Sequence, residues 1–145
     1  MSKSINQIVL IGISPFLLFF IVHFTMPPIG YEKLPGNLIQ KNQQNISNYT
    51  TIVSDENCIS AVCWYLKRND VYLLMGGGEL DYGLGYSDVS GRLIDLESAA
   101  DLINRKNGKI IIIARTRNIL RWKDQLPNPR FQDSSGPEGY TLWRY

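Results

Sequence analysis

The chain has 145 residues, of which 44% are hydrophobic and 19% are charged, and its net charge is +2. This length and composition fit one globular domain and exclude a disordered chain, collagen or a long coiled coil. Fifteen basic residues are interleaved with thirteen acidic ones, which disfavours binding of nucleic acid through a basic surface. Two cysteines are too few for a disulfide framework.

The first segment is strongly apolar. No charged residue occurs between Lys3 and Glu32, and residues 8–26 read IVLIGISPFLLFFIVHFTM. A helix of that length spans roughly 28 Å, close to the thickness of a bilayer's hydrocarbon core. The pattern predicts a transmembrane helix within residues 1–28. The alternative, a cleaved signal peptide, would have a shorter apolar core and a cleavage site of small residues. Flanking charges do not fix the orientation, and His23 is expected near the interface.

Residues 29–49 are predicted to form a juxtamembrane linker, because prolines and glycines are frequent at its start. A short helix is expected at the beginning of residues 37–48, followed by a loop. Asn45 and Asn48 each begin an N-glycosylation triplet, but this pattern is too short and common to be informative alone.

A soluble α/β domain is predicted over residues 50–145, and its first unit is strand, helix, strand. Residues 50–53 indicate a short strand, and Ser54 or Asp55 is a candidate N-cap for the helix that follows. The apolar stripe of that helix has i, i+3, i+4, i+7 spacing: Ile59, Val62, Cys63 and Leu66. Residues 71–75 are nearly all apolar, as in a strand covered on both faces, and three glycines at 76–78 end it.

The second unit repeats this order. Residues 92–94 predict a strand and Asp95 an N-cap. The helical stripe recurs at Leu96, Ala99, Ala100 and Ile103. Asn107-Gly108 is expected to stop the helix, and residues 110–114 form the most apolar strand. Residues 117–125 are expected to be a helical turn, residues 126–139 a loop and residues 140–145 a terminal strand. This order predicts a mostly parallel sheet with flanking helices.

The segment after the first unit carries the candidate contact residues. They are Glu79, Asp81, Tyr82, Tyr86, Asp88 and Arg92. Carboxylates among tyrosines could do acid–base work, hold a metal, or bind a sugar or an amine. The alternative is a solvated loop with its tyrosines packed inward. A nucleotide site is disfavoured, because residues 76–78 lack both phosphate-loop spacings and the acidic residues that follow would repel a phosphate.

No catalytic, cofactor-binding or metal-binding residue is predicted. His23 is the only histidine, so no Ser-His-Asp or Cys-His arrangement can form outside the membrane. Cys58 and Cys63 are five apart, which on a helix separates their side chains by roughly 140°. They are expected to be small buried helix residues. The three tryptophans (Trp64, Trp122 and Trp143) are expected to pack in the core.

Two motifs resemble a known family. Residues 64–70 match W-x-L-K-R-x-D, and residues 78–91 match G-E-L-x-Y-G-L-x-Y/W-x-D-x-x-G. Their order and spacing resemble the C-terminal end of the bacterial lipid A aminoarabinose transferases, the undecaprenyl phosphate-4-amino-4-deoxy-L-arabinose arabinosyl transferases. The resemblance covers the last membrane span and the soluble domain.

The resemblance implies a glycosyltransferase of the bacterial inner membrane whose C-terminal domain faces the periplasm. Such enzymes move aminoarabinose from a polyprenyl phosphate carrier to lipid A phosphates, which weakens cationic antimicrobial peptides. The family's catalytic carboxylate and donor site lie in a many-span N-terminal portion. No catalytic residue is therefore carried over to this sequence.

Two hypotheses follow. In the first, the chain is the C-terminal part of such a transferase, working beside a separately encoded multi-span part or left by a truncated gene, and is inactive alone. In the second, it is a single-pass, non-enzymatic module that binds a partner or an envelope glycan. The expected partners are the lipid bilayer, the multi-span part, and lipid A or a polyprenyl-linked sugar. Neither nucleic acid nor a cofactor is expected.

Overall fold

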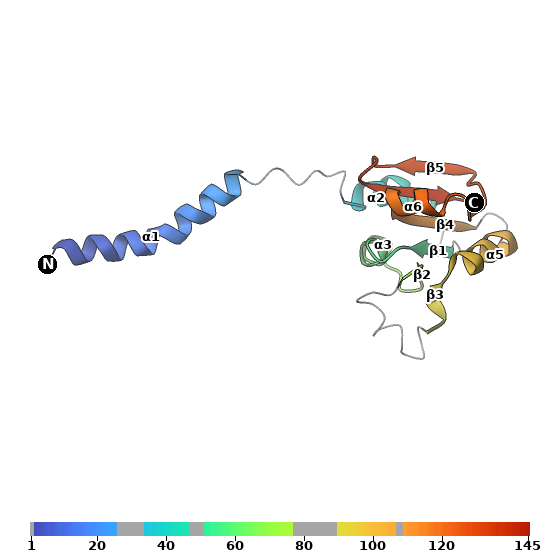
Figure 1. The fold of residues 1–145 in the computed structure, drawn as a ribbon, viewed down its shortest axis with the longest axis horizontal. Helices are drawn as coiled ribbons and strands as arrows, with labels where there is room; N and C mark the ends of the chain where they lie inside the picture. Colours follow the sequence, from blue (N-terminus) through green and yellow to red (C-terminus); the bar gives the residue numbers. More distant parts are fainter. Residues whose placement is uncertain (1, 26–33, 47–50, 77–89, 107–108) are drawn as a thin grey trace.

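The computed structural model describes residues 2–25, 34–46, 51–76, 90–106 and 109–145. Helix α1 (Ser2–Thr25) lies apart from a domain built on a sheet (Figure 1). The helical conformation expected for residues 8–26 is confirmed as far as Thr25, whose hydroxyl donates to the Ile21 carbonyl at 2.8 Å. Within the described ranges, no helix reaches the combination of length and hydropathy that a membrane crossing requires.

The sheet has six strands in the order β3-β2-β1-β4-β6-β5. The strands are β1 (Thr51–Ser54), β2 (Tyr72–Leu74), β3 (Leu93–Ile94), β4 (Ile110–Arg115), β5 (Phe131–Ser134) and β6 (Tyr140–Arg144). The first four are parallel to one another, whereas β6 is antiparallel to β4 and β5 is antiparallel to β6. The prediction of an α/β fold with a mostly parallel sheet is therefore confirmed.

Helices cover both faces of this sheet. They are α2 (Gly36–Asn42), α3 (Ile59–Leu66), α5 (Leu96–Lys106) and α6 (Thr116–Trp122), with two short 3-10 helices, η2 (Gln43–Asn45) and η4 (Ser90–Arg92). One core layer joins α2 and α3 to Ile52 and Ile111, and the other joins α5 and α6 to Val53 and Ile112. Neighbouring residues of one strand belong to different layers because successive side chains point to opposite faces. The short helix expected within residues 37–48 is α2, and its Leu38 is buried in the first layer.

Strand β5 corrects the prediction that residues 126–139 form only a loop. Its residues are mostly exposed, so the strand has no apolar alternation that a sequence pattern could reveal. It forms by backbone pairing with β6, where Gln132 lies opposite Trp143. The Trp143 indole N–H donates to the Gln132 side-chain oxygen at 3.0 Å, which adds a side-chain bond to the pairing.

Two local predictions about polar and aromatic residues are also wrong. Neither Ser54 nor Asp55 caps α3, because Cys58 occupies the N-cap position and makes no side-chain cap hydrogen bond. Trp64 is not in the core: it is 69% exposed, and the Lys67 ammonium lies 3.9 Å from the centre of its ring.

Other local predictions are confirmed. Trp122 and Trp143 are buried in the core. Asp95 accepts a hydrogen bond from the Ser98 N–H at 2.8 Å, as expected of an N-cap. The helix stop expected at residues 107–108 lies outside the described residues.

Candidate functional site

Of the six predicted contact residues, Arg92 alone lies within the described part of the chain. Glu79, Asp81, Tyr82, Tyr86 and Asp88 lie outside the described residues. Arg92 is described at the end of η4, and its guanidinium donates to the Asn69 carbonyl in the turn after α3. The hydrogen bond from Arg68 lowers the pKa of Asp70 in that turn, and the positive charge of Arg92 adds to the effect. A ligand-contact role for this segment stays a prediction.

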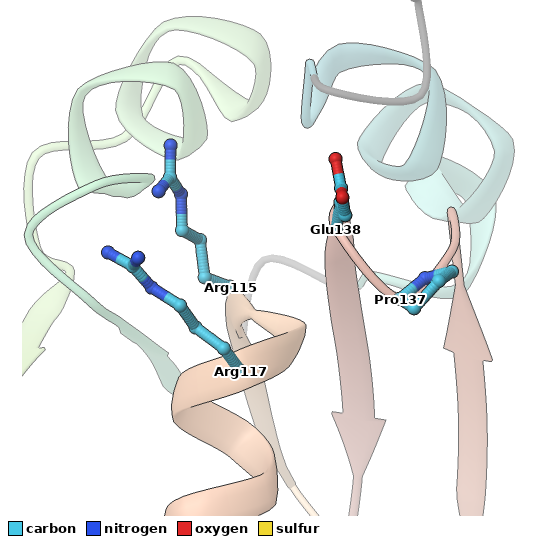
Figure 2. A pocket seen from close by; sticks show the side chains of 5 residues that line it. Arg115, Arg117, Pro137 and Glu138 are labelled. Atoms are coloured by element: carbon cyan, nitrogen blue, oxygen red, sulfur yellow. The ribbon is translucent and has the colours of Figure 1, made fainter.

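A different part of the described structure has the geometry of a site. A cavity of about 400 Å³ lies at the carboxyl end of β4, beside the end of β1. Its lining residues are Arg115, Arg117, Pro137, Glu138 and Gly139. Arg115 ends β4 and Arg117 lies in the first turn of α6, whereas the other three form the turn between β5 and β6 (Figure 2).

The topology of the sheet explains why a crevice opens there. Strands β1 and β4 are neighbours, but β1 leads into α3 on one face and β4 leads into α6 on the other. The two connections leave in opposite directions, so they cannot fill the space above the strand ends. In open α/β sheets, ligands bind in the crevice at this switch point, outside the carboxyl ends of the strands.

Asp55 fixes the corner where β4 passes into α6. This residue follows β1 directly and is only 2% exposed. Its Oδ2 atom accepts the Arg115 backbone N–H at 2.9 Å and the Asn118 side-chain amide at 2.8 Å. The carboxylate expected to cap a helix therefore joins the ends of two parallel strands.

The turn between β5 and β6 holds the same corner from the other side. The Thr116 N–H donates to the Gly139 carbonyl at 3.0 Å, and the Thr116 hydroxyl donates to the Gly136 carbonyl at 2.9 Å. Gly136 has a φ of +129°, a conformation that favours glycine. Both walls of the cavity are thus attached to Thr116, which lies between the two arginines in sequence.

The lining carries two positive charges and one negative charge, from Arg115, Arg117 and Glu138. In the part of the chain that the structure describes, no salt bridge engages either arginine. The same part contains no group of three His, Cys, Asp or Glu side chains that could hold a metal ion. The chemistry of the cavity is therefore that of arginine donors.

None of the residues that line this cavity was predicted from the sequence to contact a ligand. Arg115 and Arg117 directly follow the most apolar strand, which was a usable signal, since residues after a parallel strand lie at its ligand-binding end. This signal alone does not predict a cavity, because the cavity also requires that β4 pairs with β1 and that the last hairpin closes one side. Both are contacts between residues far apart in sequence, which a local pattern does not reveal.

The cysteines show no sign of a site. Both thiols are free. Burial raises the pKa of Cys58 to about 12, and burial also raises the pKa of the half-buried Cys63. A reactive or metal-binding cysteine needs the opposite shift, because the thiolate is the nucleophile and the ligand.

A three-layer α/β domain with a crevice at its switch point is an architecture shared by many ligand-binding domains and enzymes. Residues 30–143 match the family described as Arabinosyl transferase ArnT, C-terminal domain, so the chain belongs to this family. This confirms the resemblance carried by the two sequence motifs.

Similar curated proteins bear the name undecaprenyl phosphate-alpha-4-amino-4-deoxy-L-arabinose arabinosyl transferase. The protein of Shewanella sediminis (strain HAW-EB3) is 28% identical over 117 residues, which cover 79% of this chain and 21% of that protein. The protein of Pseudomonas savastanoi pv. phaseolicola (strain 1448A / Race 6) is 31% identical over 111 residues, covering 74% of this chain and 21% of that protein. The chain thus spans about a fifth of the length of these relatives. No solved structure gives a significant match.

Proposed function

We propose that the chain acts as the periplasmic, C-terminal part of an aminoarabinose glycosyltransferase that modifies lipid A and protects against cationic peptides. The observation that carries this proposal is the family match over residues 30–143. Relatives that cover the same region are named for transfer of arabinosyl groups from the undecaprenyl phosphate derivative of aminoarabinose. In this proposal the domain works at the inner membrane.

α1 is proposed to be the single membrane anchor. It is a helix of 24 residues, and the sequence carries no charge between Lys3 and Glu32. Large apolar side chains along its second half are exposed, among them Phe16 at 76% and Phe24 at 71%. A continuous apolar surface of this kind needs a nonpolar environment or a partner. Carbonate extraction of membranes tests the anchor: the full chain should stay in the pellet, and deletion of residues 2–25 should release the domain.

The chain alone is proposed to be inactive as a transferase. A lipid-linked donor and a lipid acceptor must meet at the membrane face, and a single helix cannot wall a cavity for both. Transfer would then require a multi-span catalytic part. The purified chain should transfer no labelled aminoarabinose, whereas membranes that also contain the multi-span part should do so. Turnover by the chain alone would contradict the proposal.

A second candidate is a membrane-anchored module that binds an envelope component without catalysis. The cavity at the ends of β1 and β4 favours it, because this site belongs to the domain itself. Chromosomal deletion of the gene for this chain distinguishes the two candidates. Loss of aminoarabinose from lipid A supports the transferase part, and unchanged lipid A supports the binding module.

A further inference from the structure

We propose that the cavity at the switch point is an oxyanion-binding site, in which Arg115 and Arg117 hold a phosphate group. The proposal concerns the domain's own residues and does not depend on the transferase role. It assigns a function to a part of the fold that lies away from the two family motifs in the sequence.

The two arginines are arranged as a pair of donors. Figure 2 shows their side chains extending in the same direction from the β4–α6 corner, with Glu138 across the cavity on the turn between β5 and β6. A guanidinium group is planar, always charged and matched to the oxygens of phosphate or carboxylate. In the described part of the chain neither group is neutralised by a salt bridge, so both remain available to a ligand.

The backbone that carries the arginines is fixed before any ligand binds. The Arg115 N–H is bound by the buried Asp55 carboxylate, and the Thr116 N–H is bound by the Gly139 carbonyl. Both ends of the corner are therefore anchored to the sheet or to its last hairpin. A site that is rigid in advance loses less conformational entropy on binding, so a few polar contacts give measurable affinity.

The volume of the cavity and the charges that line it limit the kinds of ligand that fit. A cavity of about 400 Å³ lies within the range of small-molecule sites, roughly 300–1,000 Å³, and is larger than a free phosphate needs. The cavity therefore has room for a further group beside the phosphate. Glu138 places a negative charge on the opposite wall, which restricts the anionic group to the arginine side.

The direct test is titration of the full 145-residue chain in a neutral maltoside detergent, which has no phosphate headgroup. Inorganic phosphate is added at constant ionic strength while backbone amide resonances are followed by NMR. Saturable shifts are expected for residues 115–117 and 139. A shift that appears equally across exposed lysines and arginines would overturn the site.

Three variants, each of which loses one positive charge, distinguish binding at this site from nonspecific electrostatic attraction of phosphate to the protein. Arg115→Gln and Arg117→Gln should each weaken phosphate binding about tenfold, since each removes a charge-assisted hydrogen bond. Arg121→Gln is the matched control, because Arg121 is exposed on the same helix but does not line the cavity. Equal weakening in all three variants would mean that only net charge matters. Glu138→Gln should tighten binding.

Two further binding experiments, the two arms of the test, show whether the phosphate group belongs to a soluble molecule or to a lipid. One uses glycerol phosphate in solution, and the other uses nanodiscs of phosphatidylcholine with or without phosphatidic acid, whose headgroup is also a phosphate monoester. A response that requires Arg117 in either arm supports the site and shows whether its ligand is soluble or lipid-borne. Absence of a saturable response to inorganic phosphate and in both arms would refute the proposal.

Discussion

Replacement of Asp55 by alanine is the sharpest test of how the cavity is built. The side chain accepts two partly buried donors through one oxygen atom: the Arg115 N–H and the Asn118 side-chain amide. Asp55→Ala leaves both donors without a partner. A fully buried donor that loses its acceptor costs about 1–3 kcal/mol, and these two donors are partly buried, so the free energy of unfolding should fall by roughly 2–4 kcal/mol. For a domain of this size, that is a large share of a total of about 5–15 kcal/mol.

Asp55→Asn separates the loss of an acceptor from the loss of charge. The asparagine oxygen has two lone pairs and can still accept both donors, but the bonds are no longer charge-assisted. We expect a smaller loss, about 1–2 kcal/mol. Asn118→Ala removes only one donor, so it should be nearly harmless once Asp55 is alanine. The two positions should therefore be coupled by about 1 kcal/mol in a double-mutant cycle.

The assay is urea unfolding in neutral detergent, followed by fluorescence of the buried Trp122 and Trp143. Asp101→Ala is the matched control: its carboxylate is 63% exposed and pairs only loosely with Arg105 at 3.6 Å. That control should change stability by less than about 0.5 kcal/mol. If Asp55→Ala behaved like the control, or if Asp55→Asn cost as much as Asp55→Ala, the proposed role of these hydrogen bonds would be wrong.

Three further outcomes are expected. The hydrogen bond from Asn42 lowers the pKa of Asp133, so this carboxylate stabilises the fold above its unfolded pKa and loses that effect as pH falls through its lower folded value. Unfolding midpoints measured between pH 6 and pH 2 should therefore drop less steeply in Asp133→Asn. A Cβ at Gly36 would overlap the Tyr65 ring, so Gly36→Ala should lower stability by about 1–3 kcal/mol in urea unfolding, and less in a Tyr65→Ala background. Burial raises the pKa of Cys58 to about 12, so iodoacetamide at pH 8 should leave Cys58 unmodified in the folded chain, as mass spectrometry can show, and modify it in urea.

The fold was largely predictable because its signals are local. The apolar run at residues 110–114 becomes the buried strand β4, and the stripe from Leu96 to Ile103 becomes the buried face of α5. Each pattern reports which side chains leave water, and burial decides the element. Strand β5 was missed because it is an exposed edge strand whose formation depends on β6 rather than on its own side chains.

The site was not predictable because its contacts are distant in sequence. Asp55 looks like an N-cap when only the next four residues are considered, since short acidic residues commonly precede helices. Its actual partners are 60 and 63 residues away. Trp64 was misplaced for a local reason: it lies outside the apolar stripe of α3, and its ring is exposed next to the Lys67 ammonium.

At the β4–α6 corner, the backbone and the side chain of Arg115 have different roles. Asp55 binds Arg115 through the backbone N–H and not through the guanidinium, so the fold uses the main chain of this residue. The guanidinium is left for the cavity. Side-chain variants of Arg115 therefore keep the bond that stabilises the corner, whereas variants of Asp55 lose it. Because Asp55 accepts the backbone N–H of Arg115 and not its guanidinium, we expect Arg115→Gln to lower ligand affinity and to leave the free energy of unfolding nearly unchanged.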